Sequence, residues 1–341
     1  MQIMPVKRVA VSSGRGLGSR VSAIVKLLTE AGIQANILAR PLSSIKPEDL
    51  RGVDALVIIG TDNDVLKATH QAVAEALPIL PVPPPGYSTF FASTDWEGLK
   101  DAADRLARGE YVLRPYTRIE AVVNGEAVTR ALNEVAVFPS RSASVMEYDL
   151  FVSKEFVWRD KADGVLVATP AGSTAYAFSV GGPIVMPHSR VLEVVPVNPV
   201  NPLRRALIIP EDAEVTITNI SSRYAVEVIA DGVERVRVKD EVRVIKASSP
   251  VTFIRFDEGL SDVIERKVRV VSGEAKDLPP SAKYVLKMLK VYGPASTKEL
   301  LSLTGLPERT VRYALSVLLR RGLVRRVTDL RDLRRRVYRA V

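Results

Sequence analysis

The strongest local signal in the sequence is residues 162–183, which read Ala162-Asp-Gly-Val-Leu-Val-Ala-Thr-Pro-Ala-Gly-Ser-Thr-Ala-Tyr-Ala-Phe-Ser-Val-Gly-Gly-Pro183. An apolar run typical of a buried strand leads into a turn rich in Gly, Ala, Ser and Thr. Small residues let the backbone approach a ligand closely, and the hydroxyls offer hydrogen-bond partners. From the residues alone, a ligand-binding loop and an ordinary glycine-rich corner between a strand and a helix are equally good interpretations.

The chain around this stretch divides into three regions that differ in composition and in the spacing of their apolar residues. From residue 6 to about 115, apolar runs alternate with helical spacing, which predicts an α/β domain with a parallel sheet. From about 117 to 256, short β-rich runs separated by turn residues predict a β-sandwich or barrel-like domain. Pro279-Pro280 marks a linker. The remaining residues have the order helix, helix, turn, helix and wing that is typical of a winged helix-turn-helix.

The net charge of +9 is concentrated in the last of these regions. Residues 281–341 hold 15 Lys and Arg against 4 Asp and Glu, whereas the preceding part of the chain holds 33 against 35. The excess favours double-stranded DNA as the partner of this region, with protein contacts or dimerisation as the alternative. The residues expected to contact DNA from the third helix and the wing are Arg309, Thr310, Arg312, Tyr313, Arg325, Arg326, Arg334, Arg335 and Arg336.

Other features exclude whole classes of site. The 341 residues contain no cysteine and only two histidines, His70 and His188, so a zinc or iron–sulfur site is not expected and no metal ligands are predicted. Neither histidine has a catalytic partner that the sequence identifies. No apolar run approaches the roughly 20 residues of a membrane span, and no export signal is readable, so we expect a cytoplasmic protein.

The stretch at 162–183 resembles the GSTAY-SLSAGGP signature of the NAD kinase family. Asn133-Glu134 matches the Asn-Glu motif of that family, Asp163-Gly164 its Asp-Gly before the signature, and Asp231-Gly232 a late Asp-Gly turn. The resemblance implies an α/β nucleotide-binding domain over residues 1–116, to which 256–275 return, and a β-rich NAD-binding domain over 117–255. A winged helix-turn-helix domain over 279–341 would follow, and a nucleotide cleft would lie between the first two domains.

The resemblance also implies which residues bind the cofactor, NAD or NADP. Carried over motif by motif, they are Asn133, Glu134, Asp163, Thr174, Ala175, Tyr176 and Ser179. The catalytic element of the family is Gly-Gly-Asp-Gly-Thr. Its Asp takes the proton of the ribose 2′-hydroxyl, while its glycines cradle the phosphates of the donor, usually with a divalent metal.

This chain has Gly60-Thr-Asp-Asn-Asp64 in place of that element. Asp62 is retained as the candidate base, but Thr61 carries a β-branched side chain where backbone should face phosphate, and Asp64 adds a carboxylate. A bridging Mg²⁺ would turn Asp64 into a ligand instead. The segment after the loop, Pro81 to Phe91, also lacks most of the glycines of the family.

Two hypotheses follow from this combination. The leading one is a nucleotide-responsive transcription regulator, a dimer or tetramer in which NAD(P) occupancy alters the spacing of the winged helices. The alternative is an active NAD kinase that uses ATP or polyphosphate as donor, Mg²⁺ as the metal and Asp62 as its base. A kinase acting on a lipid or sugar hydroxyl is disfavoured by Asn133-Glu134 and the signature.

Overall fold

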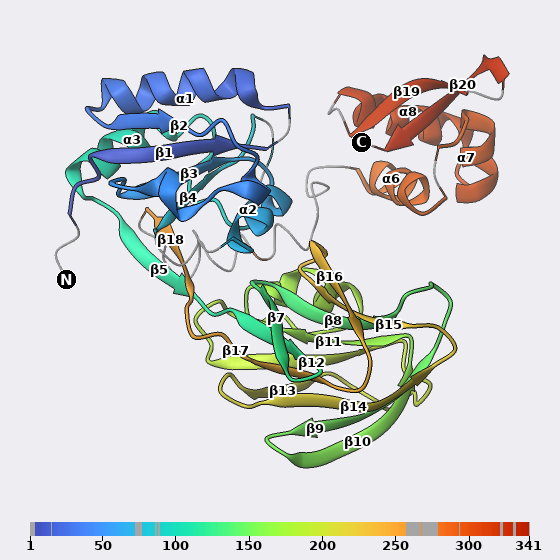
Figure 1. Ribbon diagram of the computed structural model, residues 1–341. Coiled ribbons are helices and arrows are strands. Elements are labelled where there is room, and N and C mark those ends of the chain that lie inside the picture. Colours follow the sequence, from blue (N-terminus) through green and yellow to red (C-terminus); the bar gives the residue numbers. More distant parts are fainter. Residues whose placement is uncertain are drawn as a thin grey trace. The chain divides into compact units, whose positions relative to one another are not determined.

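The computed structural model describes residues 4–14, 16–71, 77–85, 87, 89–256, 267, 279–292, 294–320, 323–329 and 332–340. The chain forms two compact units, Met1–Val271 and Ser272–Val341, and each is described by itself. Figure 1 shows that the first unit contains an α/β part and a sheet-rich part, in which β-strands predominate. This division agrees with the change in the sequence near residue 117, where alternating strand and helix patterns give way to short β-rich runs.

The α/β part is built on a six-stranded sheet with the order β2-β1-β3-β4-β18-β5. Its strands are β1 (Arg8–Ser13), β2 (Gln34–Ile37), β3 (Ala55–Ile59), β4 (Ile79–Val82), β5 (Val112–Tyr116) and β18 (Val251–Arg255). β1 to β4 pair in parallel, and β18 pairs parallel to β4 and antiparallel to β5. All five residues of β3 are buried, as expected of a central parallel strand.

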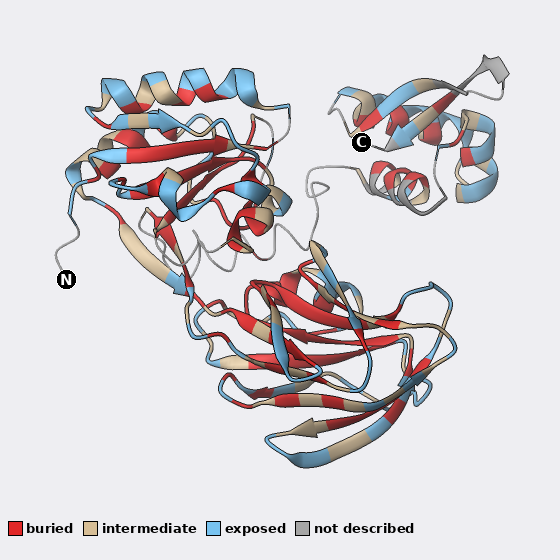
Figure 2. Ribbon diagram, in the orientation of Figure 1, coloured by how far each residue is buried: buried red, intermediate tan, exposed pale blue. Residues whose placement is uncertain are grey.

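Helices cover both faces of this sheet. On one face α1 (Gly18–Glu30) and α3 (Leu99–Arg108) pack against the strands through residues such as Ile24, Leu28 and Leu106. On the other face α2 (Asp62–Thr69) packs through Val65 and Leu66, near the short helices η1 (Leu42–Ser44) and η2 (Pro47–Leu50). Figure 2 shows the buried central strands and the exposed outer side of α1. Because the strand order reverses between β1 and β3, their carboxyl ends form a switch point, which is where ligands bind in such sheets.

Two adjacent segments connect the α/β part to the sheet-rich part. The chain leaves from β5 to β6 (Ile119–Val123) and returns from β17 (Val242–Lys246) to β18. The buried Arg118 on the outgoing segment donates to the carbonyl oxygen of Ser249 on the returning segment at 3.0 Å and to that of Thr69 at 3.1 Å. Thr69 ends α2, so Arg118 links both connections to that helix.

The structure corrects the expected boundary between these parts. The resemblance implies a β-rich domain that extends to residue 255 and a final strand around Phe253 that returns to the α/β domain. In the structure residues 251–255 form this returning strand, β18, and their apolar side chains complete the core of the α/β sheet beside β4 and β5. The expected return of residues 256–275 lies outside the described residues, except for Phe256, which packs in the α/β core, and for Lys267. The spacing of apolar residues from Val65 to Ala76 predicts a helix there, whereas the helix α2 of the structure begins at Asp62 and ends at Thr69.

The sheet-rich part consists of two six-stranded sheets, with the orders β10-β9-β14-β17-β6-β7 and β13-β12-β11-β8-β15-β16. The remaining strands are β7 (Glu126–Ala131), β8 (Glu134–Pro139), β9 (Met146–Val152), β10 (Glu155–Ala162), β11 (Gly164–Ala168), β12 (Val191–Val197), β13 (Leu207–Pro210), β14 (Val215–Ser222), β15 (Val226–Ala230) and β16 (Glu234–Val238). Residues from both sheets, among them Val135, Val167, Leu150 and Ile217, share one apolar core. A β-sandwich is therefore the correct description of this part.

The C-terminal unit contains three helices and a hairpin among its described residues. They are α6 (Pro280–Tyr292), α7 (Thr297–Thr304), α8 (Glu308–Arg320), β19 (Val324–Asp329) and β20 (Asp332–Ala340). The Ser-x-x-Glu spacing of Ser296 and Glu299 predicts a capping box, and the structure has it at the start of α7. Gly305 ends this helix with φ 65°. α8 buries Val311, Ala314, Leu315 and Leu318 in the core of the unit. In neither unit does a helix of the described residues have the length and apolar character that crossing a membrane requires.

Candidate functional site

The loop from Gly60 to Asp64 joins the end of β3 to the start of α2. Thr61 is the N-cap of the helix, and the carboxylate of Asp64 accepts hydrogen bonds from the backbone N and from Oγ1 of Thr61, both at 3.0 Å. Two of the three residues that depart from the family pattern, Thr61 and Asp64, therefore interact with each other as a capping pair. A carboxylate in the first turn also interacts favourably with the positive end of the helix dipole.

The same carboxylate fills the space between two glycines at the switch point. Gly14 follows β1 and Gly60 follows β3. A Cβ atom on Gly14 would lie 2.5 Å from Oδ2 of Asp64, and one on Gly60 would lie 2.6 Å from Cβ of Asp64. The N-terminus of a helix at this edge of the sheet is a natural anion site. Asp64 thus puts a negative charge of the protein itself at this natural anion site.

Asp62 is held against the segment that follows β4. Its carboxylate accepts hydrogen bonds from the backbone N of Phe90 at 2.9 Å and of Phe91 at 3.1 Å. On the opposite side, the fully buried Arg255 donates to the carbonyl oxygen of Phe91, and also to the hydroxyl of Tyr116 at 3.0 Å. The backbone at Phe90 and Phe91 is therefore fixed between an acidic and a basic side chain, and the position of the candidate base is well defined.

The signature residues follow β11 as the short helices η4 (Gly172–Thr174) and α4 (Tyr176–Ser179). Gly172 lies against the backbone of Asn133, because a Cβ on this glycine would be 2.1 Å from the Asn133 carbonyl oxygen. That oxygen also accepts a hydrogen bond from the backbone N of Thr169 at 2.8 Å. The signature and the Asn-Glu motif, more than 30 residues apart in the sequence, are thus in direct contact.

Asp231 organises the Asn-Glu motif. Its buried carboxylate accepts hydrogen bonds from three consecutive backbone amides, those of Leu132 at 2.8 Å, Asn133 at 2.7 Å and Glu134 at 3.1 Å. It also lies 3.1 Å from Nε2 of His70, the C-cap residue of α2. One carboxylate therefore connects the Asn-Glu motif to the helix that begins with Asp62.

His70 has partners that the sequence did not reveal. Its side chain is 1% exposed, and Nδ1 lies 3.5 Å from Oε2 of Glu234. Burial opposes protonation of the ring, but Asp231 and Glu234 together raise the pKa of His70 above its ordinary value. The histidine thus lies between two carboxylates at the end of α2, and its contacts are with the protein itself.

Glu134 is buried and provides an unused polar atom. Burial, and then the charge of Asp231, raise the pKa of Glu134 to about 8. Its Oε2 is buried and has no hydrogen-bond partner among the described residues. A buried polar atom normally has a partner, so this atom fits a hydrogen-bonding group of a bound molecule.

Tyr176 lies near both Asp163 and Glu134. Burial raises the pKa of Tyr176, and so do the charges of Asp163 and Glu134. The Tyr176 ring is 42% exposed and stacks on Phe138, with 6.0 Å between the ring centroids. Residue Gly164 contacts the same Phe138 ring. The structure thus gathers the Asn-Glu motif, Asp163 and Tyr176 in one place.

The other signature residues differ in exposure. Thr174 is buried, Ala175 is half-buried, and Ser179 is exposed at the end of α4. Asn133 is buried beside Glu134, with 9% of its surface exposed. An exposed aromatic ring beside an unpartnered buried carboxyl group fits one planar and one polar portion of a dinucleotide.

Lys267 is a buried charged residue in this region that the sequence does not indicate. Nζ of Lys267 donates to the carbonyl oxygen of Pro170 at 2.7 Å and to Oγ of Ser173 at 2.8 Å, and lies 5.2 Å from the centre of the Phe90 ring. Burial lowers the pKa of Lys267 to about 7, although the charge of Glu193 opposes this shift. Lys267 joins the signature to the segment that holds Asp62. No local pattern indicates this role, because a lysine in a charged segment is usually solvated.

Metal ligands are sparse around this site. Within the described part of the chain, no group of three or more His, Cys, Asp or Glu side chains is arranged to hold a metal ion. Mg²⁺ is commonly held by one or two carboxylates together with substrate phosphates. Asp64 at the switch point is compatible with that mode of binding, in which the donor brings the metal.

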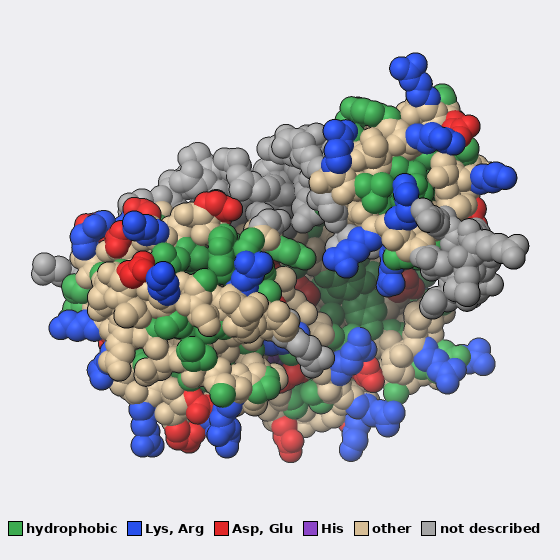
Figure 3. All heavy atoms as spheres, turned by 90° about the horizontal axis from the view of Figure 1, so that it is seen from above, with side chains coloured by type: hydrophobic (Ala, Val, Ile, Leu, Met, Phe, Trp, Pro, Cys, Tyr) green, Lys and Arg blue, Asp and Glu red, His purple; other side chains and the backbone are tan. Residues whose placement is uncertain are grey.

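The predicted DNA-contacting residues lie in the C-terminal unit. Arg309, Arg312 and Tyr313 are exposed on α8, where Arg312 pairs with Glu308 at 2.6 Å, and Thr310 is half-buried. Arg325 and Arg326 are exposed on β19, and residues 334–336 belong to β20. Figure 3 shows Lys and Arg side chains on the described surface of this unit.

The chain is similar in sequence to several known proteins. The profile of the ATP-NAD kinase C-terminal domain matches residues 132–256. The NAD kinase of Methanopyrus kandleri is 34% identical over 215 residues, which are 63% of this chain and 77% of that protein. The NAD kinase of Methanothermobacter thermautotrophicus is 30% identical over 278 residues, 79% of this chain and 95% of that protein.

Two solved structures have the same fold. The yeast NADH kinase complexed with NADH aligns with a TM-score of 0.67 at 21% identity, over 80% of this chain and 89% of that one. The Archaeoglobus fulgidus NAD kinase in complex with ATP aligns with a TM-score of 0.62 at 23% identity, over 76% and 98%. With the sequence relatives, the profile match and the site geometry taken together, the chain belongs to the NAD kinase family.

Proposed function

We propose that the chain transfers a phosphoryl group from ATP or polyphosphate to the ribose 2′-hydroxyl of NAD, which forms NADP. The named relatives are kinases of NAD, and they favour this enzyme over the nucleotide-responsive regulator that was our leading hypothesis from the sequence. That hypothesis depended on the altered loop at residues 60–64. Asp62 is retained in that loop, with its carboxylate fixed by two backbone amides.

The observation that carries this proposal is the position of the Asp231 carboxylate. It binds the amides of the Asn-Glu motif and contacts His70 at the end of α2. Asp62 is the first residue of the same helix. The Asn-Glu motif, which would bind the dinucleotide, and Asp62, the candidate base, are thus fixed relative to each other. A proton transfer between a bound hydroxyl and a base requires such fixed positions.

In the proposed reaction the ribose 2′-hydroxyl oxygen attacks the terminal phosphorus of the donor. Asp62 accepts the hydroxyl proton, the bond from phosphorus to the bridging oxygen breaks, and ADP or shortened polyphosphate leaves. Glu134, Asp163 and Tyr176 would orient the dinucleotide. A divalent metal brought by the donor would neutralise phosphate charge beside Asp64.

The test is incubation of the purified chain with NAD, Mg²⁺ and either ATP or polyphosphate, followed by enzymatic detection of NADP. We expect NADP to form, and we expect Asp62→Asn to abolish its formation while NAD binding by calorimetry persists. If a preparation that binds NAD forms no NADP with either donor, the kinase proposal is overturned. The chain would then be a protein that binds NAD without phosphorylating it.

A second function is proposed for the C-terminal unit, namely that it is a winged helix-turn-helix that binds double-stranded DNA. The support is its charge, together with the exposed Arg309, Arg312 and Tyr313 on the outer face of α8. Arginines at this end of a third helix are suited to base edges, and Arg325 and Arg326 on the hairpin to phosphates.

Fluorescence anisotropy with a random duplex tests this second function. We expect affinity to fall steeply with added salt, because bound cations are released from phosphates, and Arg325→Ala with Arg326→Ala to reduce that salt dependence. The exposed Arg235, which lies on the sandwich, provides a control substitution that should leave binding unchanged. Salt-independent or absent binding refutes the proposal. Saturating NAD(P) in the same assay tests nucleotide-dependent regulation, which is abandoned if affinity for DNA stays the same.

A further inference from the structure

A pocket of about 410 Å³ lies beside the two connections between the α/β part and the sandwich. It is lined by parts of both connections, by Glu211 after β13, and by the segment 187–190 before β12. Neither Asp62 nor any residue of the predicted dinucleotide site lines it. Its volume is within the range of about 300–1,000 Å³ found for small-molecule sites.

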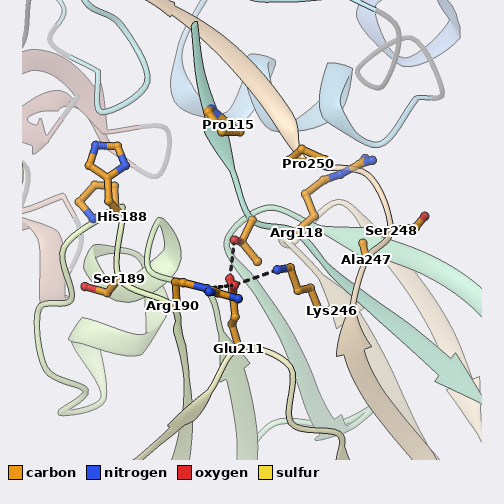
Figure 4. Close-up of a pocket in the computed structure, with 12 residues that line it drawn as sticks. Pro115, Arg118, His188, Ser189, Arg190, Glu211, Lys246, Ala247, Ser248 and Pro250 are labelled. Carbon is orange, nitrogen blue, oxygen red and sulfur yellow. Dashed lines mark hydrogen bonds and ion pairs between the residues drawn. The ribbon is translucent and has the colours of Figure 1, made fainter.

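A buried carboxylate organises the polar side of this pocket. Glu211 accepts hydrogen bonds from Nε of Arg190 at 2.8 Å, from Nζ of Lys246 at 2.8 Å and from Oγ1 of Thr117 at 3.1 Å. Figure 4 shows Arg190 and Lys246 reaching Glu211 from opposite sides. Burial acts to raise the pKa of Glu211, but these hydrogen bonds lower it below its ordinary value, so the carboxylate is ionised at neutral pH.

Positive charge nevertheless exceeds negative charge in the lining. Arg118, Arg190 and Lys246 line the pocket together with one acidic residue, Glu211. The Arg190 and Lys246 side chains are 82% and 41% exposed. A guanidinium has five N–H donors and an ammonium three, so each keeps donors beyond the one directed at Glu211.

We propose that this pocket binds a small phosphorylated molecule, with its phosphate between Arg190 and Lys246. Guanidinium and ammonium groups bind phosphate through charge-assisted hydrogen bonds. Pro115, Pro187 and Pro250 provide apolar surface for the rest of the molecule. Glu211 holds the two cations in place and partly neutralises them, which limits the affinity for the anion. The proposal does not depend on kinase activity.

The test is calorimetric titration of the full chain with ribose 5-phosphate at low ionic strength. Lys246→Met keeps the aliphatic stem and removes the charge, and it should weaken binding roughly tenfold, which is typical for loss of one charged hydrogen bond. Glu211→Gln should act in the opposite direction and tighten binding, because it removes the competing negative charge while keeping a hydrogen-bond acceptor.

A matched control is Lys161→Met. Lys161 is 54% exposed and pairs with Glu147 at the same 2.8 Å, but it does not line the pocket. We expect this variant to bind like the parent, and circular dichroism confirms that all variants are folded. Absence of binding at millimolar ribose 5-phosphate overturns the proposal. So does binding that Lys246→Met and Glu211→Gln leave unchanged, since the ligand would then be held elsewhere, for instance in the dinucleotide site.

Discussion

Replacing Asp64 by Asn removes the negative charge at the switch point, and with it the ion pair between Oδ1 of Asp64 and Nζ of Lys67 at 4.0 Å. The Asn side chain has the same shape, and its carbonyl oxygen can still accept a hydrogen bond from the backbone N of Thr61. If the phosphate donor binds at the N-terminus of α2, Asp64→Asn should strengthen donor binding. The reason is that the carboxylate now lies between Gly14 and Gly60, in the space where a phosphate would be placed.

The size of the effect follows from Coulomb repulsion. Two unit charges about 4 Å apart near a protein surface repel by about 4 kcal/mol. The Asp64 side chain is 17% exposed, so water and movement of the carboxylate reduce this value, and we take about half of it. About 2 kcal/mol corresponds to a roughly 30-fold decrease in the KM for ATP. Loss of a first-turn carboxylate should at the same time cost about 0.3–1 kcal/mol of stability.

The assay is the initial rate of NADP formation at saturating NAD and Mg²⁺ with varied ATP. A matched control is Asp101→Asn, which removes a carboxylate from the first turn of α3. It should reproduce the small stability loss without changing the KM for ATP. An unchanged KM in Asp64→Asn refutes the repulsion argument. An increased KM would mean that Asp64 assists the donor, as a ligand of a metal brought with it.

Three further outcomes are expected. Asp62→Asn should lower the rate of NADP formation by at least about 10²-fold, the usual effect of losing a general base, with the Kd for NAD unchanged by calorimetry. Asp231→Ala leaves three backbone amides without their acceptor. At about 1–3 kcal/mol each, the free energy of unfolding in urea should fall by at least about 3 kcal/mol, whereas the exposed Asp240→Ala should change it little. Burial and the charge of Asp231 raise the pKa of Glu134 to about 8, so its contribution to stability is complete below about pH 4.5 and is lost as pH rises to about 8. Glu134→Gln should remove that part of the pH dependence, and an identical urea profile from pH 5 to 8.5 in both proteins would contradict it.

The α/β part, the β-sandwich and the C-terminal helical unit can be predicted from the sequence because each depends on local patterns of residues. Buried strands such as β3 and β11 are continuous apolar runs, and the capping box at Ser296 and the turn at Gly305 follow from residue type alone. The apolar spacing predicts that α2 begins at Val65, three residues after its actual start at Asp62. Asp62, Asn63 and Asp64 do not belong to an apolar face, and only the contact of Asp64 with Thr61 extends the helix to include them.

Contacts between distant segments were not readable in the same way. His70 and Asp231 are 161 positions apart, and no local pattern pairs a histidine at a helix end with an aspartate in a turn between strands. The sequence identified Asp231-Gly232 only as a turn, and the structure adds its three hydrogen bonds to residues 132–134. Lys267 was missed for the same reason, since its burial depends on the packing of the signature against Phe90.

These long-range contacts couple the position of the Asn-Glu motif to the position of Asp62. Asp62 contacts the backbone of Phe90 and Phe91, while the other end of its helix is held through His70 by Asp231. A shift of the Asn-Glu motif would therefore have to move Asp231, and with it either α2 or the contact to His70. Buried hydrogen-bonded networks resist such partial changes, because any broken contact leaves a buried polar group unsatisfied. Dinucleotide binding at the motif and the position of the base should accordingly change together, even though no side chain spans the distance between them.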